Sequence, residues 1–249
     1  MKSLVTKVAL VTGGNKGIGR GIVRKLADSG AIVVFTYHKG DAKAKVLEAE
    51  IIESRGEAIA IKINTSESEE IKTVIEHIIT KYGRIDILVN CAGSLIPRKM
   101  PPNSSKKDLE KIWKKSLFDA AQMVSQLTPH LEEEGRIITI GNFAEQNSDF
   151  VMTGNYAAAK ENLGIYTRFW SKKLAKKNIT VNIVQPGLIG TGNIHNTQEG
   201  LIDKIALKRF GKPQDVGNIV SYLASKKGNY ITGATFTIDG GLNLYSSTS

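Results

Sequence analysis

Runs of apolar residues of strand length alternate along the chain with stretches of helical periodicity. Most of the runs are continuous and rich in β-branched residues, a pattern typical of strands that are buried on both faces of a parallel sheet. Seven such runs occupy residues 8–11, 31–35, 58–63, 85–89, 136–140, 180–184 and 235–238. Strands that alternate with helices throughout predict right-handed β-α-β crossovers, and therefore an α/β fold with a seven-stranded parallel sheet.

Two of the helical stretches begin with a capping signal, a serine followed three residues later by an acidic residue. These pairs are Ser66 with Glu69 and Ser105 with Asp108, and each predicts a helix N-terminus. A chain of 249 residues of which 41% are hydrophobic can bury one substantial core, and no linker divides it. Residues 96–105 are expected to form a loop. We therefore expect a single domain over residues 1–249.

A glycine-spaced turn follows the first apolar run, with the sequence Thr-Gly-Gly-Asn-Lys-Gly-Ile-Gly over residues 12–19. Gly13 permits a tight turn, Gly17 lets the backbone approach a pyrophosphate, and Gly19 lets the next helix lie close to the strand. The helix N-terminus then directs unpaired amides at the phosphates. Glycines also mark ordinary turns, but strand, turn and helix in this order predict a doubly wound Rossmann domain that binds a dinucleotide.

Ligands of such sheets bind outside the carboxyl ends of the strands, and polar or glycine-containing segments follow the later strands here. The fourth run is followed by residues 90–93, Asn-Cys-Ala-Gly, and the fifth by Gly141 and Asn142. The sixth is followed by residues 186–191, Pro-Gly-Leu-Ile-Gly-Thr. The helical stretch between the fifth and sixth runs contains Tyr156 and Lys160 in a Tyr-Ala-Ala-Ala-Lys sequence.

These motifs, in this order and spacing, resemble the classical short-chain dehydrogenase/reductase family over essentially the whole chain. The closing Ile-Asp-Gly-Gly at residues 238–241 also matches the family pattern. Within the family the chain is most similar to 3-oxoacyl-[acyl-carrier-protein] reductases, notably over residues 136–141 and 155–160. The resemblance implies an NADP-dependent oxidoreductase that acts on CH-OH and C=O groups, with 3-oxoacyl thioesters as the leading substrate class.

Tyr156 and Lys160 are four residues apart on a predicted helix, which places them on one face. A lysine ammonium close to a phenol favours the phenolate, so Tyr156 can hand a proton to a ketone oxygen as hydride arrives. In the family the same lysine also holds the nicotinamide ribose. Lys160 is therefore expected to have two tasks.

One catalytic position departs from the family pattern after the fifth strand. The family has a serine there, which hydrogen-bonds the substrate carbonyl, and alignment of the strand places Asn142 at that position. The usual spacing to the tyrosine would instead select Phe143, so we infer one inserted residue within 144–154. The Asn142 amide can still donate to an oxyanion. Ser148 is a weaker candidate for this donor.

A second departure concerns the helix after the fourth strand. The family's asparagine, which anchors a water in the proton relay to the lysine, corresponds to Ser116. Serine is shorter, so either the relay is rearranged or carbonyl reduction is slow or lost. We expect retained activity, because Tyr156, Lys160 and the cofactor elements are intact and a missing donor usually slows a site rather than abolishing it.

The end of the second strand predicts the cofactor. An NAD enzyme usually carries an acidic residue there, which binds the ribose 2′-hydroxyl and would repel a 2′-phosphate. Residues 35–39 contain no acid, and Lys16, His38 and Lys39 can converge on a phosphate, so NADP(H) is expected. The resemblance implies a cofactor site made of Gly13, Asn15, Lys16, Gly17, Ile18, Gly19, Tyr37, His38, Lys39, Asn64, Thr65, Asn90, Ala92, Gly93, Tyr156, Lys160, Pro186, Gly187, Ile189 and Thr191.

The charge and the remaining composition narrow the expected partners. The formal net charge is +10, but the lysines are spread over several helices among glutamates, so solvated faces are favoured over nucleic-acid binding. One cysteine and four histidines show no metal-ligand spacing, and the absence of a signal segment or membrane span predicts a cytoplasmic protein. Family members are usually tetramers, which implies a homotetramer here.

The nature of the substrate carrier stays open between acyl carrier protein and coenzyme A. Lys172, Lys173, Lys176 and Lys177 can meet an acidic carrier. Glu132, Glu133 and Glu134, expected at a helix end, would repel one. The alternative to a reductase is an NADP-binding protein with weak or lost turnover and a regulatory or binding role, for which Asn142 and Ser116 are the sequence evidence.

Overall fold

The computed structural model describes residues 2–92, 117–141, 154–191 and 199–244, and for residues 154–161 and 199 it describes the backbone alone. The strands are β1 Val8–Val11, β2 Ile32–Tyr37, β3 Glu57–Lys62, β4 Ile85–Asn90, β5 Leu131–Ile140, β6 Thr180–Pro186 and β7 Thr235–Ile238. The helices are α1 Gly17–Asp28, α2 Asp41–Glu53, α3 Ser68–Tyr82, α5 Asp119–Leu127, α6 Gly154–Leu174, α7 Glu199–Ile202 and α8 Pro213–Ala224. Short 3-10 turns are η2 Thr128–His130, η5 Ala175–Lys177, η7 Lys226–Gly228 and η8 Leu242–Leu244.

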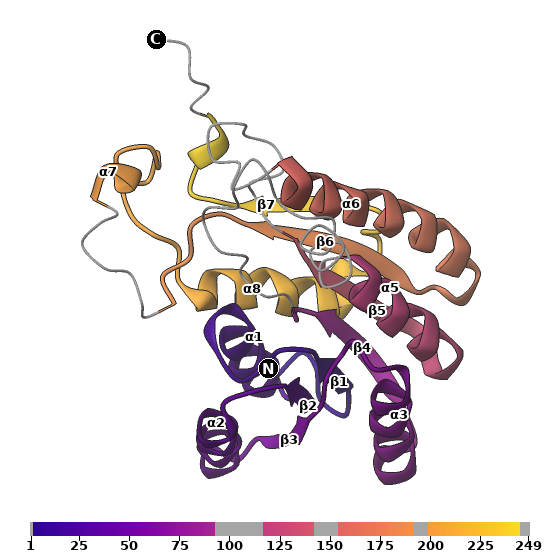
Figure 1. The fold of residues 1–249 in the computed structure, drawn as a ribbon. Helices are drawn as coiled ribbons and strands as arrows, with labels where there is room; N and C mark the ends of the chain where they lie inside the picture. The colour runs from indigo at the N-terminus through magenta and orange to yellow at the C-terminus, as the bar shows by residue number, and fades with distance from the viewer. Residues whose placement is uncertain (1, 93–116, 142–153, 192–198, 245–249) are drawn as a thin grey trace.

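The strands form one seven-stranded sheet in the order β3-β2-β1-β4-β5-β6-β7, with every pair parallel (Figure 1). This confirms the predicted fold. The largest difference in bounds concerns β5, which begins at Leu131 rather than at residue 136. Three glutamates hide this extension in the sequence, while Leu131 is buried and pairs with Ile85. The chain reverses the direction of strand addition between β1 and β4, which creates the switch point where such sheets bind ligands.

Helices cover both faces of the sheet because successive strand residues point to opposite sides. Ala9 and Val11 pack with α1, α2 and α8 in one core cluster. Val8 and Leu10 pack on the other face with α3, α5 and the end of α6. The continuous apolar runs of β1, β2, β4 and β6 therefore mark strands that are buried on both sides. In the part of the chain that the structure describes, no helix has the length and apolar character needed to cross a membrane.

The capping box predicted at Ser66 is wrong. Helix α3 begins two residues later, with Glu67 as its N-cap and no side-chain capping bond. The Ser66 hydroxyl instead donates to Asp119 Oδ2 at 2.8 Å, because α5 lies beside the start of α3. Asn64 Oδ1 accepts from the Ser66 N–H at 3.2 Å and so shapes the turn. The second predicted box, at Ser105, lies outside the described residues.

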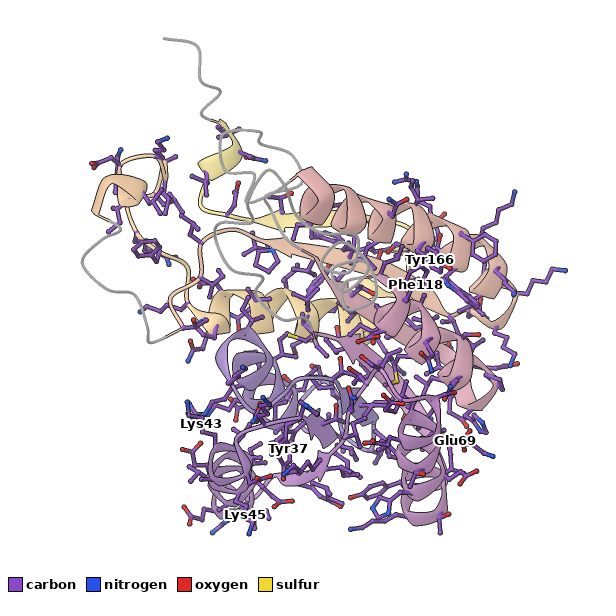
Figure 2. The ribbon with its side chains drawn as sticks, viewed as in Figure 1. Tyr37, Lys43, Lys45, Glu69, Phe118 and Tyr166 are labelled. Atoms are coloured by element: carbon purple, nitrogen blue, oxygen red, sulfur yellow. The ribbon has the colours of Figure 1, made fainter. Side chains whose placement is uncertain are left out.

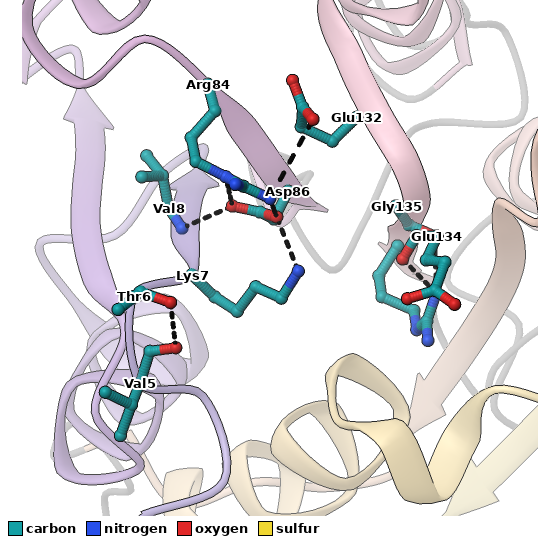
Figure 3. Close-up of polar contacts among 10 residues, drawn as sticks. Val5, Thr6, Lys7, Val8, Arg84, Asp86, Glu132, Glu134 and Gly135 are labelled. Carbon is teal, nitrogen blue, oxygen red and sulfur yellow. Dashed lines mark hydrogen bonds and ion pairs between the residues drawn. The ribbon is translucent and has the colours of Figure 1, made fainter.

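A buried carboxylate ties the amino ends of the central strands together (Figure 3). Asp86 in β4 accepts from Lys7 Nζ at 2.8 Å, from the Val8 N–H at 2.9 Å and from Arg84 Nε at 2.9 Å. Arg84 also lies 4.0 Å from Glu132. This network lies at the edge of the sheet opposite the carboxyl ends, so its role is structural.

Candidate cofactor and active site

The turn between β1 and α1 has the backbone conformation that its glycines predict. Gly13 (φ +67°) and Gly17 (φ +53°) both lie in the left-handed region, where a Cβ causes strain. A Cβ on Gly19 would lie 2.2 Å from the carbonyl oxygen of Gly13. The first turn of α1 therefore folds directly onto the glycine turn, which only glycine at position 19 allows.

The N-terminus of α1 fits a phosphate group. Its N-cap, Lys16, is exposed, and the Lys16 side chain makes no capping hydrogen bond. The positive end of a twelve-residue helix thus meets a tight turn whose glycines let other segments of the chain pack closely against it. A Cβ on Gly17 would lie 3.3 Å from Thr191 Cγ2. Thr191, which follows β6, is therefore brought to the turn, while its part in cofactor binding stays a prediction.

Thr12 joins the turn after β1 to the segment after β4. Its hydroxyl oxygen accepts from the N–H groups of Cys91 and Ala92, each at 2.9 Å. Asn90 is buried, and its amide donates to the Ala120 carbonyl oxygen at 3.3 Å. These contacts hold Asn90 and Ala92 at the switch point. Gly93 lies outside the described residues.

Asn15 connects the same turn to the loop after β2. Its side-chain amide donates to the carbonyl oxygens of Lys39 and Gly40, at 2.7 and 3.3 Å. Asn15 is buried, so its amide holds the loop that carries His38 and Lys39. Both of these residues, like Lys16, are exposed. The three predicted phosphate-binding side chains therefore stand on two loops that are fastened together.

The start of α2 holds a residue that sequence reasoning missed, Asp41. Asp41 accepts from Lys62 Nζ at 3.1 Å. Tyr37 is buried at the end of β2, and Asp41 lies beside its hydroxyl. Burial, and then the neighbouring Asp41, raise the pKa of Tyr37. Figure 2 shows Tyr37 beside α2, which also carries Lys43 and Lys45. An acid does lie near this strand end, beyond the segment 35–39 that the prediction considered.

Asn64 and Thr65 follow β3, the edge strand. The Asn64 side chain is used locally, since Oδ1 accepts from Ser66 and Nδ2 donates to Glu67 Oε1 at 3.4 Å. Among the described residues, the recorded hydrogen bonds of Asn64 go to its own loop and to α3. The predicted part of Asn64 and Thr65 in the cofactor site stays a prediction.

The segment after β6 is held by the C-terminal part of the chain. Gly187 donates its N–H to the Ile238 carbonyl oxygen at 2.9 Å, and a Cβ on Gly187 would lie 2.6 Å from Asp239 Cβ. Asp239 in turn accepts from the N–H groups of Gly241 and Asn243. Ile189 pairs with Gly211 and, like Ile18, packs on the core below. Pro186, Gly187 and Ile189 are thus placed at the carboxyl edge of the sheet.

The catalytic candidates are placed only in part. Tyr156 and Lys160 lie in the first turns of α6, whose N-terminal end is at the carboxyl edge of the sheet (Figure 1). Their side chains, and Asn142, Ser148 and Ser116, lie outside the described residues. Gly141, just before Asn142, donates to the Val184 carbonyl oxygen at 2.8 Å, which fixes the end of β5. The roles of these residues stay predictions.

The charged clusters considered for carrier binding lie far from this edge. Lys172 and Lys173 occupy the last turn of α6, and Lys176 and Lys177 lie in η5. At 1.5 Å per residue they begin roughly 24 Å along the helix from Tyr156. The expectation of a helix end at residues 132–134 is wrong, because these glutamates lie in β5, whose first residue, Leu131, pairs with Ile85 of β4. The glutamates therefore also lie away from the carboxyl ends of the strands.

The chain is similar to proteins of known family over nearly its full length. The family profile described as enoyl-(acyl carrier protein) reductase matches residues 13–243. A 3-oxoacyl-[acyl-carrier-protein] reductase of Synechocystis sp. is 35% identical over 252 residues, which cover 98% of this chain and 100% of the relative.

Solved structures agree with these sequence matches. A dehydrogenase/reductase from Sinorhizobium meliloti 1021 has a TM-score of 0.92 at 34% identity, with 97% of this chain and 96% of that chain covered. A short chain dehydrogenase from Burkholderia cenocepacia J2315, solved in complex with NADP, has a TM-score of 0.91 at 30% identity, with coverages of 97% and 99%.

Proposed function

Because the chain belongs to the short-chain dehydrogenase/reductase family and is an oxidoreductase of that family, we propose that it reduces the carbonyl group of a 3-oxoacyl thioester with NADPH. The observation that carries this proposal is the joint placement of two features at one edge of the sheet. The glycine turn and α1 fit a dinucleotide phosphate, and the helix with Tyr156 and Lys160 begins at the same edge.

The cofactor proposal rests on the cradle around the glycine turn. The α1 amides and Gly17 would hold the pyrophosphate, and Lys16, His38 and Lys39 would hold a 2′-phosphate. When bound, the nicotinamide would supply hydride for the reduction. The Burkholderia relative was solved with NADP, which supports the choice of NADP(H) for this chain.

The chain's own part in the reaction is proton delivery and orientation. We assign Tyr156 as the proton donor to the carbonyl oxygen, with Lys160 favouring the phenolate that remains and holding the ribose. Asn142 would donate its amide to the same oxygen as negative charge develops there. Ser116 would stand in the relay that returns a proton to Lys160.

The substrate class is supported by the relatives and limited by the charge pattern. The curated relatives are named as 3-oxoacyl reductases, whereas the family profile is named after enoyl reductases. We propose the carbonyl substrate, because a proton donor suits a ketone oxygen that becomes a hydroxyl. An acidic carrier bound at Lys172 to Lys177 would deliver its acyl group to the wrong edge. Coenzyme A and a carrier that docks elsewhere are the two sources to compare.

Replacement of Tyr156 with phenylalanine tests the reaction. Tyr156→Phe is expected to lower turnover by at least about 10²-fold while leaving the Kd for NADPH within about twofold, since only the transferable proton is removed. Lys160→Ala should damage both quantities. The measurement is NADPH consumption with a panel of 3-oxoacyl and enoyl thioesters, together with fluorescence titration of NADPH. If Tyr156→Phe keeps most of the turnover, the assignment of the proton donor fails.

The alternative function, an NADP-binding protein without turnover, has its own outcome in the same assay. It is favoured by Asn142 and Ser116, which replace the family's serine and asparagine. Wild type would then bind NADPH but reduce no carbonyl in the panel. The double variant Asn142→Ser with Ser116→Asn would then gain carbonyl reduction that the wild type lacks. If the wild type is a working reductase, no such gain from zero can be seen.

We also propose that the protein assembles as a homotetramer. Helix α6 exposes Ile165, Tyr166 and Phe169, and Phe118 is exposed just before α5. Figure 2 shows Tyr166 and Phe118 on these elements. Several large exposed apolar side chains on one helix are typical of a protein interface rather than of a solvated face. Members of the family are usually tetramers, which supports the same assembly.

A further inference from the structure

Three residues from separate elements meet beside the proposed 2′-phosphate site. Tyr37 ends β2, Lys62 ends β3 directly opposite it in the strand register, and Asp41 begins α2. Lys62 Nζ donates to Asp41 Oδ2 at 3.1 Å, and the Tyr37 hydroxyl lies beside the same carboxyl group. Lys62 is therefore the cation that pairs with the Asp41 carboxylate.

The position of Asp41 makes its charge relevant to the cofactor. Asp41 directly follows Gly40, and the Gly40 carbonyl oxygen accepts from Asn15 of the glycine turn at 3.3 Å. The intervening loop carries His38 and Lys39, which are exposed. For a dinucleotide bound at the glycine turn, an acid one residue from this contact would stand on the side of the ribose 2′ position, where an NAD enzyme places its carboxylate.

The ion pair is of little use for stability. The Lys62 and Asp41 side chains are 57% and 54% exposed, and pairs this exposed usually contribute little to folding. The hydrogen bond from Lys62 is the main reason that the pKa of Asp41 lies below its ordinary value. The carboxylate is therefore charged at neutral pH, and its field at the site depends on whether Lys62 is present.

We propose that Lys62 determines cofactor specificity as a positioning residue, by holding Asp41 in an ion pair so that this carboxylate neither repels a 2′-phosphate nor binds a ribose 2′-hydroxyl. The inference rests on the proposed NADP(H) site. Without Lys62, Asp41 carries an uncompensated negative charge. It repels the phosphate of NADPH and is free to accept a hydrogen bond from the 2′-hydroxyl of NADH.

The test is the pair of dissociation constants for NADPH and NADH, measured by titration at low ionic strength. Lys62→Met is expected to raise the Kd for NADPH about five- to tenfold and to lower the Kd for NADH about threefold, because both changes follow from an Asp41 carboxylate without its ion pair. Lys62→Met with Asp41→Asn should return the affinity ratio to that of wild type. Lys62→Arg should keep the wild-type ratio, since it preserves the pair.

The matched control is Lys226→Met, which removes an exposed lysine from η7 at the opposite edge of the sheet. It should leave the ratio unchanged. Equal weakening of both cofactors in Lys62→Met, or a loss for NADPH alone that Asp41→Asn does not reverse, overturns the proposal. A wild type that does not prefer NADPH contradicts the proposed cofactor. If the wild type prefers NADPH but Lys62→Met keeps the wild-type ratio of the two dissociation constants, the role of Lys62 is wrong while the proposed cofactor stands.

Discussion

Asp86 shows how one residue holds together the amino ends of the central strands. It lies inside the apolar run 85–89, yet its carboxylate accepts hydrogen bonds from Lys7, Arg84 and the Val8 backbone. Burial raises the pKa of Asp86, but the hydrogen bonds from Arg84, Lys7 and Val8 together outweigh it and hold the pKa below its ordinary value. A carboxyl group with a lowered folded-state pKa stabilises the fold above its unfolded pKa, and this contribution is lost as the pH falls through the folded value.

Asp86→Asn is therefore expected to lower the free energy of unfolding at pH 7 by about 2–3 kcal/mol, because it removes charge-assisted bonds while Lys7 and Arg84 keep partial access to water. The difference from wild type should begin to shrink below about pH 4, the ordinary aspartate pKa of the unfolded chain, and should disappear as the pH falls through the lower folded-state pKa of Asp86. Urea unfolding at several pH values measures this. Asp28→Asn, an exposed residue at the end of α1, is the control. A difference that does not depend on pH would contradict the argument.

At the scale of elements, α1 and α8 pack through two glycines. A Cβ on Gly217 would lie 2.8 Å from the Gly21 carbonyl oxygen, and a Cβ on Gly21 would lie 2.5 Å from Pro213 Cβ. The helices approach so closely only because both positions lack a side chain. Since α1 begins at the glycine turn, this packing also fixes the direction in which its N-terminus points.

Gly217→Ala should lower the free energy of unfolding by about 1–3 kcal/mol, because the clash with backbone exceeds the gain of up to about 1 kcal/mol in helix propensity. The same change should also weaken the binding of NADPH, because α1 must shift to make room for the added methyl group. Denaturant unfolding and cofactor titration measure the two effects. Gly200→Ala is the matched control, because a Cβ there meets nothing within 4 Å. A Gly217→Ala variant as stable as wild type would show that the helices separate at no cost.

At the scale of the whole molecule, the apolar side chains on α6 predict the assembly. Light scattering after size exclusion should give a mass near four times 27.1 kDa. Phe169→Glu together with Ile165→Lys should give smaller species, because charges would be buried in the interface. Val46→Glu on α2 replaces a similarly exposed residue and should leave the mass unchanged. A wild-type monomer, or a tetramer that survives the α6 changes, would contradict the proposal.

The sequence by itself determined the features that depend on neighbouring residues. The seven apolar runs mark the seven strands, and most of the runs are continuous because the central strands are buried on both faces. Gly13 and Gly17 permit the positive φ values that the turn adopts. The predicted side chains after β1, β2, β4 and β6 stand at one edge because parallel strands end there together.

Tertiary structure alone decided the contacts between residues far apart in the chain. Ser66 matches a local capping pattern, but its hydroxyl bonds Asp119 on another helix. The extension of β5 to Leu131 depends on its pairing with Ile85, and the ion pair of Asp41 with Lys62 depends on β3 lying beside β2. No periodicity or motif encodes such pairs, because their energy arises only when the sheet brings distant residues together.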